Sequence, residues 1–113
     1  MIVAGLLLLA VLGLSPGEPQ MVRLTWYDQG TVTASGEAPY WGGAACSYHY
    51  PLGTAFALDG EAFRCNDRGG GINGEPWLDV YCITGDQARW VAAHGPYALV
   101  EVLRDDDGFP HSR

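Results

Sequence analysis

Two aspartates bracket a glycine-rich stretch between two cysteines, in the segment CNDRGGGINGEPWLDVYC (residues 65–82). Asp67 precedes the glycines and Asp79 follows them, 12 positions later. A carboxylic acid can act as a general acid or base when burial or a like-charged neighbour raises its pKa above that of free Asp. The pair Asp67 and Asp79 therefore defines a candidate catalytic site.

A structural interpretation of the same two residues is also open. An Asp before Arg-Gly-Gly is an ordinary turn residue, because its side chain accepts hydrogen bonds from nearby backbone amides. An Asp in an apolar strand can instead hydrogen-bond a hydroxyl of the fold, such as that of Thr33 or Ser35. Under this interpretation Asp67 and Asp79 stabilise the protein and perform no reaction.

Aromatic rings accompany the aspartates, and rings of this kind stack on the apolar faces of sugars. The candidate substrate-binding residues combine rings with hydroxyl and imidazole groups: Tyr27, Thr33, Ser35, Tyr48, His49 and Trp77. Alternation with Val22 and Leu24 places Trp26 in the core, and Trp90 is expected in the core from its helix. The rings of the loop over residues 37–53 are expected to be exposed: Tyr40, Trp41, Tyr48 and Tyr50.

Three cysteines lie beyond the N-terminal region: Cys46, Cys65 and Cys82. Cys82 belongs to the apolar, strand-like run LDVYCI, so we expect it to be a buried free thiol and Cys46–Cys65 to be the disulfide. The sequence contains no C-x-x-C or H-x-x-x-H spacing, which argues against a zinc site. We expect neither a metal nor a cofactor.

The charge balance excludes several classes of partner. Six arginines and no lysine stand against 13 acidic residues, for a formal charge of −7. A protein that binds nucleic acid or an anionic membrane surface normally carries a basic patch, so both partners are disfavoured. The balance fits a neutral or amino-sugar-containing ligand.

The first residues form an apolar leader. Ile2 to Leu14 is a run of 13 apolar residues, roughly 20 Å long as a helix, which is short for a membrane span and typical of a secretory signal peptide. An uncleaved anchor and a truncated start are the alternatives. The expected organisation is a leader at 1–20, one domain at 21–103 and a charged tail at 104–113, with a location outside the cell, in the periplasm or in the cell envelope.

Short strands dominate the remaining pattern. Strands are predicted at 21–27, 30–36, 54–58, 61–65, 77–83 and 97–103, with Asp59-Gly60 as a hairpin turn. Residues 37–53 are predicted to be a loop. One helix is predicted from Thr84 to Ala93, with Thr84 and Gln87 as a capping box and Gly95 at its end. This set of elements indicates a mainly β fold, a compact barrel with one short helix.

Several segments resemble a known family in the same order. TWYDQGTVTASGE (residues 25–37), YPLGT (50–54) and NDRGG (66–70) resemble motifs of rare lipoprotein A-like domains. DRGGGINGEPWLDVY (67–81) resembles the signature of the three-aspartate domains, an element that recurs in the barrel of membrane-bound lytic transglycosylase A. The likeness extends from about Met21 to Leu103. It implies a six-stranded double-psi β-barrel, related also to the expansins.

The resemblance also implies a function. Such domains bind or cleave peptidoglycan glycan strands, and the positions of Asp79 and Asp67 match the proposed acid and a required aspartate of the family. The resemblance therefore implies Asp79 as general acid/base and Asp67 as its electrostatic partner. Ser47 and Cys46 stand where these families carry a His and a third Asp, and His49 lies nearby. We therefore expect a monomeric, secreted lytic transglycosylase. The alternatives are a non-catalytic glycan-binding or wall-loosening module, and a structural envelope or phage-associated domain.

Overall fold

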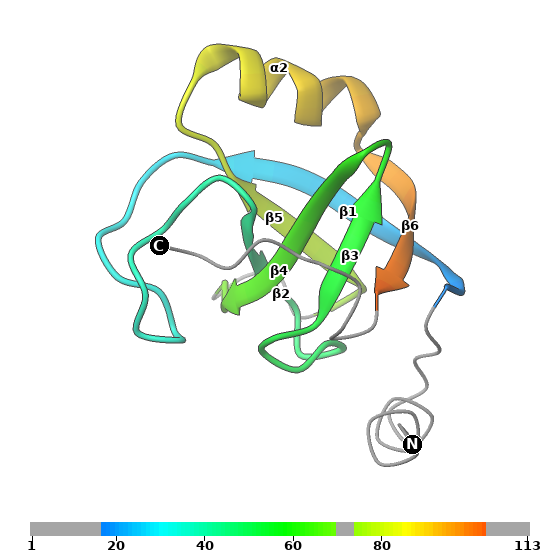
Figure 1. Ribbon diagram of the computed structural model, residues 1–113, viewed down its shortest axis with the longest axis horizontal. Coiled ribbons are helices and arrows are strands. Elements are labelled where there is room, and N and C mark those ends of the chain that lie inside the picture. Colours follow the sequence, from blue (N-terminus) through cyan, green and yellow to red (C-terminus); the bar gives the residue numbers. More distant parts are fainter. Residues whose placement is uncertain (1–16, 70–73, 104–113) are drawn as a thin grey trace.

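A computed structural model describes residues 17–69 and 74–103 of the chain. The predicted leader and tail lie largely outside these ranges. Within them the elements are β1 (Pro19–Tyr27), β2 (Gly43–Cys46), β3 (Ala55–Leu58), β4 (Glu61–Asp67), β5 (Trp77–Tyr81), α2 (Gly85–His94) and β6 (Tyr97–Leu103). The strands close into a barrel in the order β1-β5-β2-β4-β3-β6 (Figure 1).

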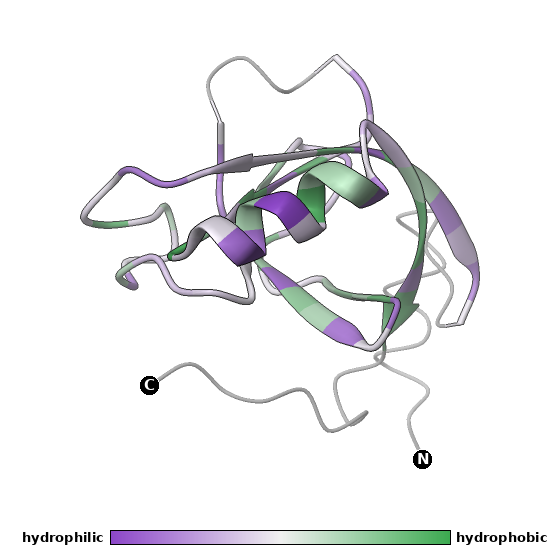
Figure 2. Ribbon diagram, turned by 90° about the horizontal axis from the view of Figure 1, so that it is seen from above, coloured by the Kyte–Doolittle hydropathy of each residue, from purple (hydrophilic) through white to green (hydrophobic). Residues whose placement is uncertain are grey.

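The barrel mixes parallel and antiparallel pairs. The β1–β5 and β2–β4 pairs are parallel, whereas β1–β6, β2–β5, β3–β4 and β3–β6 are antiparallel. α2 lies over one end of the barrel in both views, and hydrophobic and hydrophilic residues alternate along the strands (Figure 2). The predicted fold class is confirmed: the protein is mainly β, a closed six-stranded barrel with one short helix in the described part of the chain.

The core follows from the alternation. Val22 and Leu24 of β1 point inward, as do Leu78 and Val80 of β5, and all four are at most 2% exposed. β6 contributes every second residue in the same way, because neighbouring side chains of a strand point to opposite faces. The residues that alternate with these buried ones along β1, β5 and β6 therefore lie on the outer face of the barrel.

Local signals placed the hairpin and the helix correctly. Asp59 and Gly60 both have positive φ, 48° and 84°, as a tight hairpin turn requires. Thr84 accepts a hydrogen bond from the Gln87 amide, Gln87 bonds back to Thr84, and Gly95 donates to the Val91 carbonyl at the other end. The capping box and the helix end are confirmed.

Two predictions about residues 30–53 were wrong. Residues 30–36 form no strand; a turn there is closed by the Gly36 amide, which donates to the Thr33 carbonyl at 2.9 Å. β2 lies within the predicted loop instead. All four of its residues are buried, and a strand covered on both faces shows no alternation by which sequence could reveal it.

Four aromatic residues differ from expectation. Tyr40 and Trp41, which were expected to be exposed, are only partly so, and Trp41 packs against the core. Trp26 is 43% exposed, because the last-but-one position of β1 lies at the rim of the barrel even though alternation assigns it to the inner face. Tyr50 is only 1% exposed, and its ring packs edge-on against Phe56 with centroids 4.9 Å apart. Trp90 is half-buried and packs against the core cluster.

The cysteine prediction is confirmed. Cys46 and Cys65 form a disulfide that joins β2 to β4, with their Cα atoms 5.7 Å apart. Cys82 is a buried free thiol. Burial, together with the charges of Asp79 and Asp28, raises the pKa of this thiol to about 11.

Candidate functional site

Four residues form a row across the outer face of four neighbouring strands. Asp79 of β5 pairs with Thr25 of β1 on one side and with Ala45 of β2 on the other, and Ala45 pairs in turn with Asp67 of β4. Residues directly paired across strands share a face. The two aspartates therefore flank one small alanine, with Cα atoms about 10 Å apart, twice the spacing of neighbouring strands.

A bulge in β4 places Asp67 in this row. Ala44 pairs with Cys65, but the next residue, Ala45, pairs with Asp67, so Asn66 is the extra residue. Asn66 is 2% exposed, and its side-chain amide lies against Gly43 and donates to the Glu37 carboxylate at 3.5 Å. Bulges re-aim side chains, and here the bulge brings the second carboxylate to the level of Asp79.

Asp79 is the carboxyl group whose environment favours its protonated form. It is half-buried between Trp77 and Tyr81, which share its face of β5. Burial raises the pKa of Asp79 above its ordinary value, whereas the hydrogen bond from the Thr25 hydroxyl, at 2.7 Å from Oδ1, acts in the opposite direction. The net effect is a raised pKa, as a general acid needs.

Asp67 makes mainly structural contacts. Its Oδ1 accepts hydrogen bonds from the backbone amides of Ala34 and Arg68, both at 2.8 Å. Its Oδ2 accepts the Tyr27 hydroxyl at 3.4 Å. Asp67 thus ties β4 to the turn around residue 34 and to β1.

Tyr27 connects the two aspartates electrostatically. Burial raises the pKa of its hydroxyl strongly, and the charges of Asp67 and Asp79 add to that effect. Its ring packs edge-on against Tyr81 at 5.3 Å. The phenol is therefore a protonated hydrogen-bond donor at neutral pH, placed between the acid site and the Asp67 anchor.

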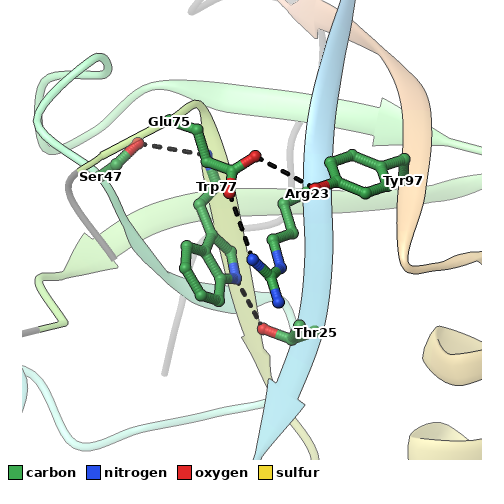
Figure 3. Close-up of polar contacts among 6 residues, drawn as sticks. All are labelled: Arg23, Thr25, Ser47, Glu75, Trp77 and Tyr97. Atoms are coloured by element: carbon green, nitrogen blue, oxygen red, sulfur yellow. Dashed lines mark hydrogen bonds and ion pairs between the residues drawn. The ribbon is translucent and has the colours of Figure 1, made fainter. Parts of the chain in front are cut away.

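Trp77 lies beside the row in a polar cluster (Figure 3). Its indole nitrogen donates to the Thr25 hydroxyl at 2.8 Å, and the Arg23 guanidinium stacks on its ring at 4.2 Å. Glu75 accepts hydrogen bonds from Arg23 at 3.2 Å and from the Tyr97 hydroxyl at 3.3 Å. The cluster fixes the plane of the indole next to Asp79.

The other predicted substrate-binding residues lie around this centre. Thr33 is buried and bonds Ser35 at 2.9 Å, so neither supplies the predicted contact to Asp79, which Thr25 makes instead. Tyr48 and His49 are exposed on the loop after β2. His49 contacts the Ser47 hydroxyl at 3.2 Å, and Arg68 stacks on the Tyr48 ring at 4.7 Å.

Sequence reasoning did not identify three contributors to this site: Thr25, Ala45 and Arg68. Arg68 donates to the carbonyls of Cys46, Ser47 and Tyr50 and so holds the loop that carries His49. Thr25 alternates with Tyr27 on the outward face of β1, which is a usable signal. Ala45 gives no such sequence signal, because its place between the two aspartates depends on the pairing of β2 with both neighbouring strands.

The described ranges contain no cluster of three or more His, Cys, Asp or Glu side chains that could hold a metal ion. None of the helices in these ranges is long and apolar enough to cross a membrane. A surface depression lies elsewhere, between β1, β3 and β6, and is lined by Pro19, Leu58, Leu99 and Glu101 among others.

Comparison of the chain with protein-family models, with curated proteins and with solved structures gives no match.

Proposed function

We propose that this protein is a secreted lytic transglycosylase that cleaves the glycan strands of peptidoglycan, with Asp79 as the general acid/base. The observation that carries the proposal is the environment of Asp79: a half-buried carboxyl group with a raised pKa, flanked by Trp77 and Tyr81 on the outer face of a barrel. The resemblance of residues 25–81 to rare lipoprotein A-like and three-aspartate domains supports peptidoglycan as the substrate.

One carboxyl group is sufficient for this reaction. Protonated Asp79 donates its proton to the glycosidic oxygen as the bond to the anomeric carbon breaks. The resulting carboxylate then takes the proton from the 6-hydroxyl of the same muramic acid, whose oxygen closes a 1,6-anhydro ring. Asp79 ends the cycle protonated, and no water is consumed.

The residues around Asp79 have binding and supporting roles in this scheme. Trp77 and Tyr81 lie two positions on either side of Asp79, so their rings can stack on sugars to each side of the scissile bond. Tyr27 offers a neutral phenol as a hydrogen-bond donor. Asp67 holds Tyr27 and the turn at residue 34, and its own contacts with backbone amides favour a supporting role over a chemical one.

Export agrees with the disulfide between Cys46 and Cys65, since disulfides persist in oxidising compartments. It also agrees with the apolar leader of the sequence.

A non-catalytic glycan-binding module is the second candidate. Ser47 occupies the position of the family histidine, is fully buried, and accepts a hydrogen bond from the Trp77 amide at 3.1 Å. A site in which Ser47 and Asp67 are both committed to holding backbone could bind a glycan without cleaving it.

Products from purified sacculi distinguish these functions. Incubation with the protein, followed by mass spectrometry of the soluble fraction, should give muropeptides that end in 1,6-anhydromuramic acid. Reducing-end products would identify a hydrolase and overturn the proposal. Retention of the protein on sacculi with no soluble product would support the binding module.

A further inference from the structure

Trp77, Thr25 and Asp79 form a chain of two hydrogen bonds across β1 and β5. The indole Nε1 of Trp77 lies 2.8 Å from the Thr25 Oγ1, and that oxygen lies 2.7 Å from Oδ1 of Asp79. The first of these bonds is drawn in Figure 3. The residues are adjacent in space because Thr25 pairs with Asp79, two positions after Trp77 pairs with Arg23.

The direction of both bonds follows from the chemistry of the groups. An indole nitrogen can only donate, so the Thr25 oxygen accepts from Trp77. A threonine hydroxyl has one hydrogen, and Thr25 donates it to Oδ1 of Asp79 in the 2.7 Å bond. Oδ1 is an acceptor in this arrangement, which leaves Oδ2 as the oxygen that carries the proton when Asp79 is protonated.

We infer that Trp77 and Thr25 are positioning residues that fix which oxygen of Asp79 carries the transferable proton. The inference rests on the proposed function for its use in catalysis, but the hydrogen-bond chain itself is independent of any activity. Oδ2 becomes the oxygen that gives the proton to the glycosidic oxygen and takes one back, while Oδ1 stays bonded to Thr25 throughout.

The donor end of the chain is held by contacts of its own. The Arg23 guanidinium lies 4.2 Å from the centre of the Trp77 ring, and Glu75 holds Arg23 at 3.2 Å. The backbone amide of Trp77 donates to the buried Ser47 hydroxyl at 3.1 Å. These contacts restrict the indole, so its N–H keeps its direction toward Thr25.

The pKa of Asp79, measured by carboxyl-carbon NMR, tests the chain without any assay of activity. Thr25→Val removes the hydroxyl at nearly constant volume and should raise the pKa, because a hydrogen bond to a carboxylate stabilises the charged form. Trp77→Phe keeps an aromatic ring under Arg23, removes the N–H donor and makes the ring system smaller. It should raise the pKa by a smaller amount, because it weakens the Thr25 bond and does not abolish it.

The double variant decides between a chain and two separate effects. If Trp77 acts through Thr25, adding Trp77→Phe to Thr25→Val changes the pKa of Asp79 no further. If Trp77 only covers Asp79, the smaller ring admits water, the pKa falls, and it falls equally in both backgrounds. That second pattern would overturn the inference.

Rescue and activity complete the test. Thr25→Ser keeps the hydroxyl that Thr25→Val removes, so the pKa of Asp79 should be close to that of the wild type. A pKa as high as in Thr25→Val, with an unchanged melting temperature, would contradict the hydrogen-bond chain. On sacculi, Thr25→Val should reduce the cleavage rate on the order of 10- to 100-fold and move the pH profile upward. If the wild-type protein cleaves nothing, the proposed function fails. The pKa values of the variants would still show whether the hydrogen-bond chain from Trp77 to Asp79 exists.

Discussion

At the scale of single residues, the two aspartates have different environments although the sequence presents them as a pair. Asp79 is half-buried and holds one hydroxyl, and burial raises its pKa. Asp67 receives two backbone amides and a phenol. The turn-residue interpretation therefore describes the contacts of Asp67, whereas the environment of Asp79 suits proton transfer.

Substitutions at Asp67 should separate anchoring from charge. Asp67→Ala removes the acceptor of two amides and should lower the free energy of unfolding by about 1.5–3 kcal/mol. Asp67→Asn keeps an oxygen for those amides and should retain most of that stability. Urea denaturation of both variants measures the difference. Equal losses would show that the charge, and not the acceptor geometry, stabilises the turn at residue 34.

At the scale of elements, the sequence could predict those features of the fold that depend on residues close together in the chain. The Asp59-Gly60 hairpin, the capping box of α2, β5 and β6 follow from turn chemistry and alternation. β2 and the bulge at Asn66 could not be predicted, because they depend on pairing with strands far along the chain. The contact between Thr25 and Asp79 spans 54 positions and was missed for the same reason.

The link between α2 and the β3–β4 turn should depend on pH. Nδ1 of His94 faces the Trp90 carbonyl at 2.8 Å and Nε2 faces the Asp59 carboxylate at 3.0 Å, so only the doubly protonated ring can donate to both. The Trp90 carbonyl and then the Asp59 carboxylate raise the pKa of His94. A raised pKa in the folded protein gives stability that is present below the unfolded value and lost as the pH rises through the folded value.

Asp59→Asn is the matched variant for this effect, because Asn tolerates the positive φ of 48° at this position. The wild type should exceed the variant in stability by less than about 1 kcal/mol, as the pair is exposed, with the largest difference near pH 5–6. The difference should shrink toward pH 8. Denaturation at several pH values would refute the link if the difference stayed constant or grew with pH.

At the scale of the whole molecule, the candidate site is assembled from four neighbouring strands of the barrel. Thr25, Asp79, Ala45 and Asp67 come from four strands, and the disulfide joins two of these, β2 and β4. Loss of the disulfide should therefore weaken both the fold and the site. For a separation of 19 residues, the Cys46→Ala/Cys65→Ala variant should lose about 3 kcal/mol of stability.

Thiol labelling checks this arrangement directly. The folded protein should not react, because Cys82 is buried and its pKa is raised to about 11. Unfolding without reductant should expose one thiol, and unfolding with reductant should expose three. Three labelled cysteines without reductant would mean that the disulfide is not formed.

The central claim is that Asp79 transfers the proton, and the most direct measurement is sacculus digestion by Asp79→Asn alongside its melting temperature. Asn has nearly the same shape and can still accept from Thr25, but it cannot give and retake a proton. Exposed Asp28, close to Tyr27 in the sequence, supplies the control variant Asp28→Asn. The account predicts that Asp79→Asn melts close to the wild type and forms anhydro-muropeptides about 10²–10⁴ times more slowly, while Asp28→Asn keeps its activity. A lower melting temperature with unchanged specific activity would contradict it.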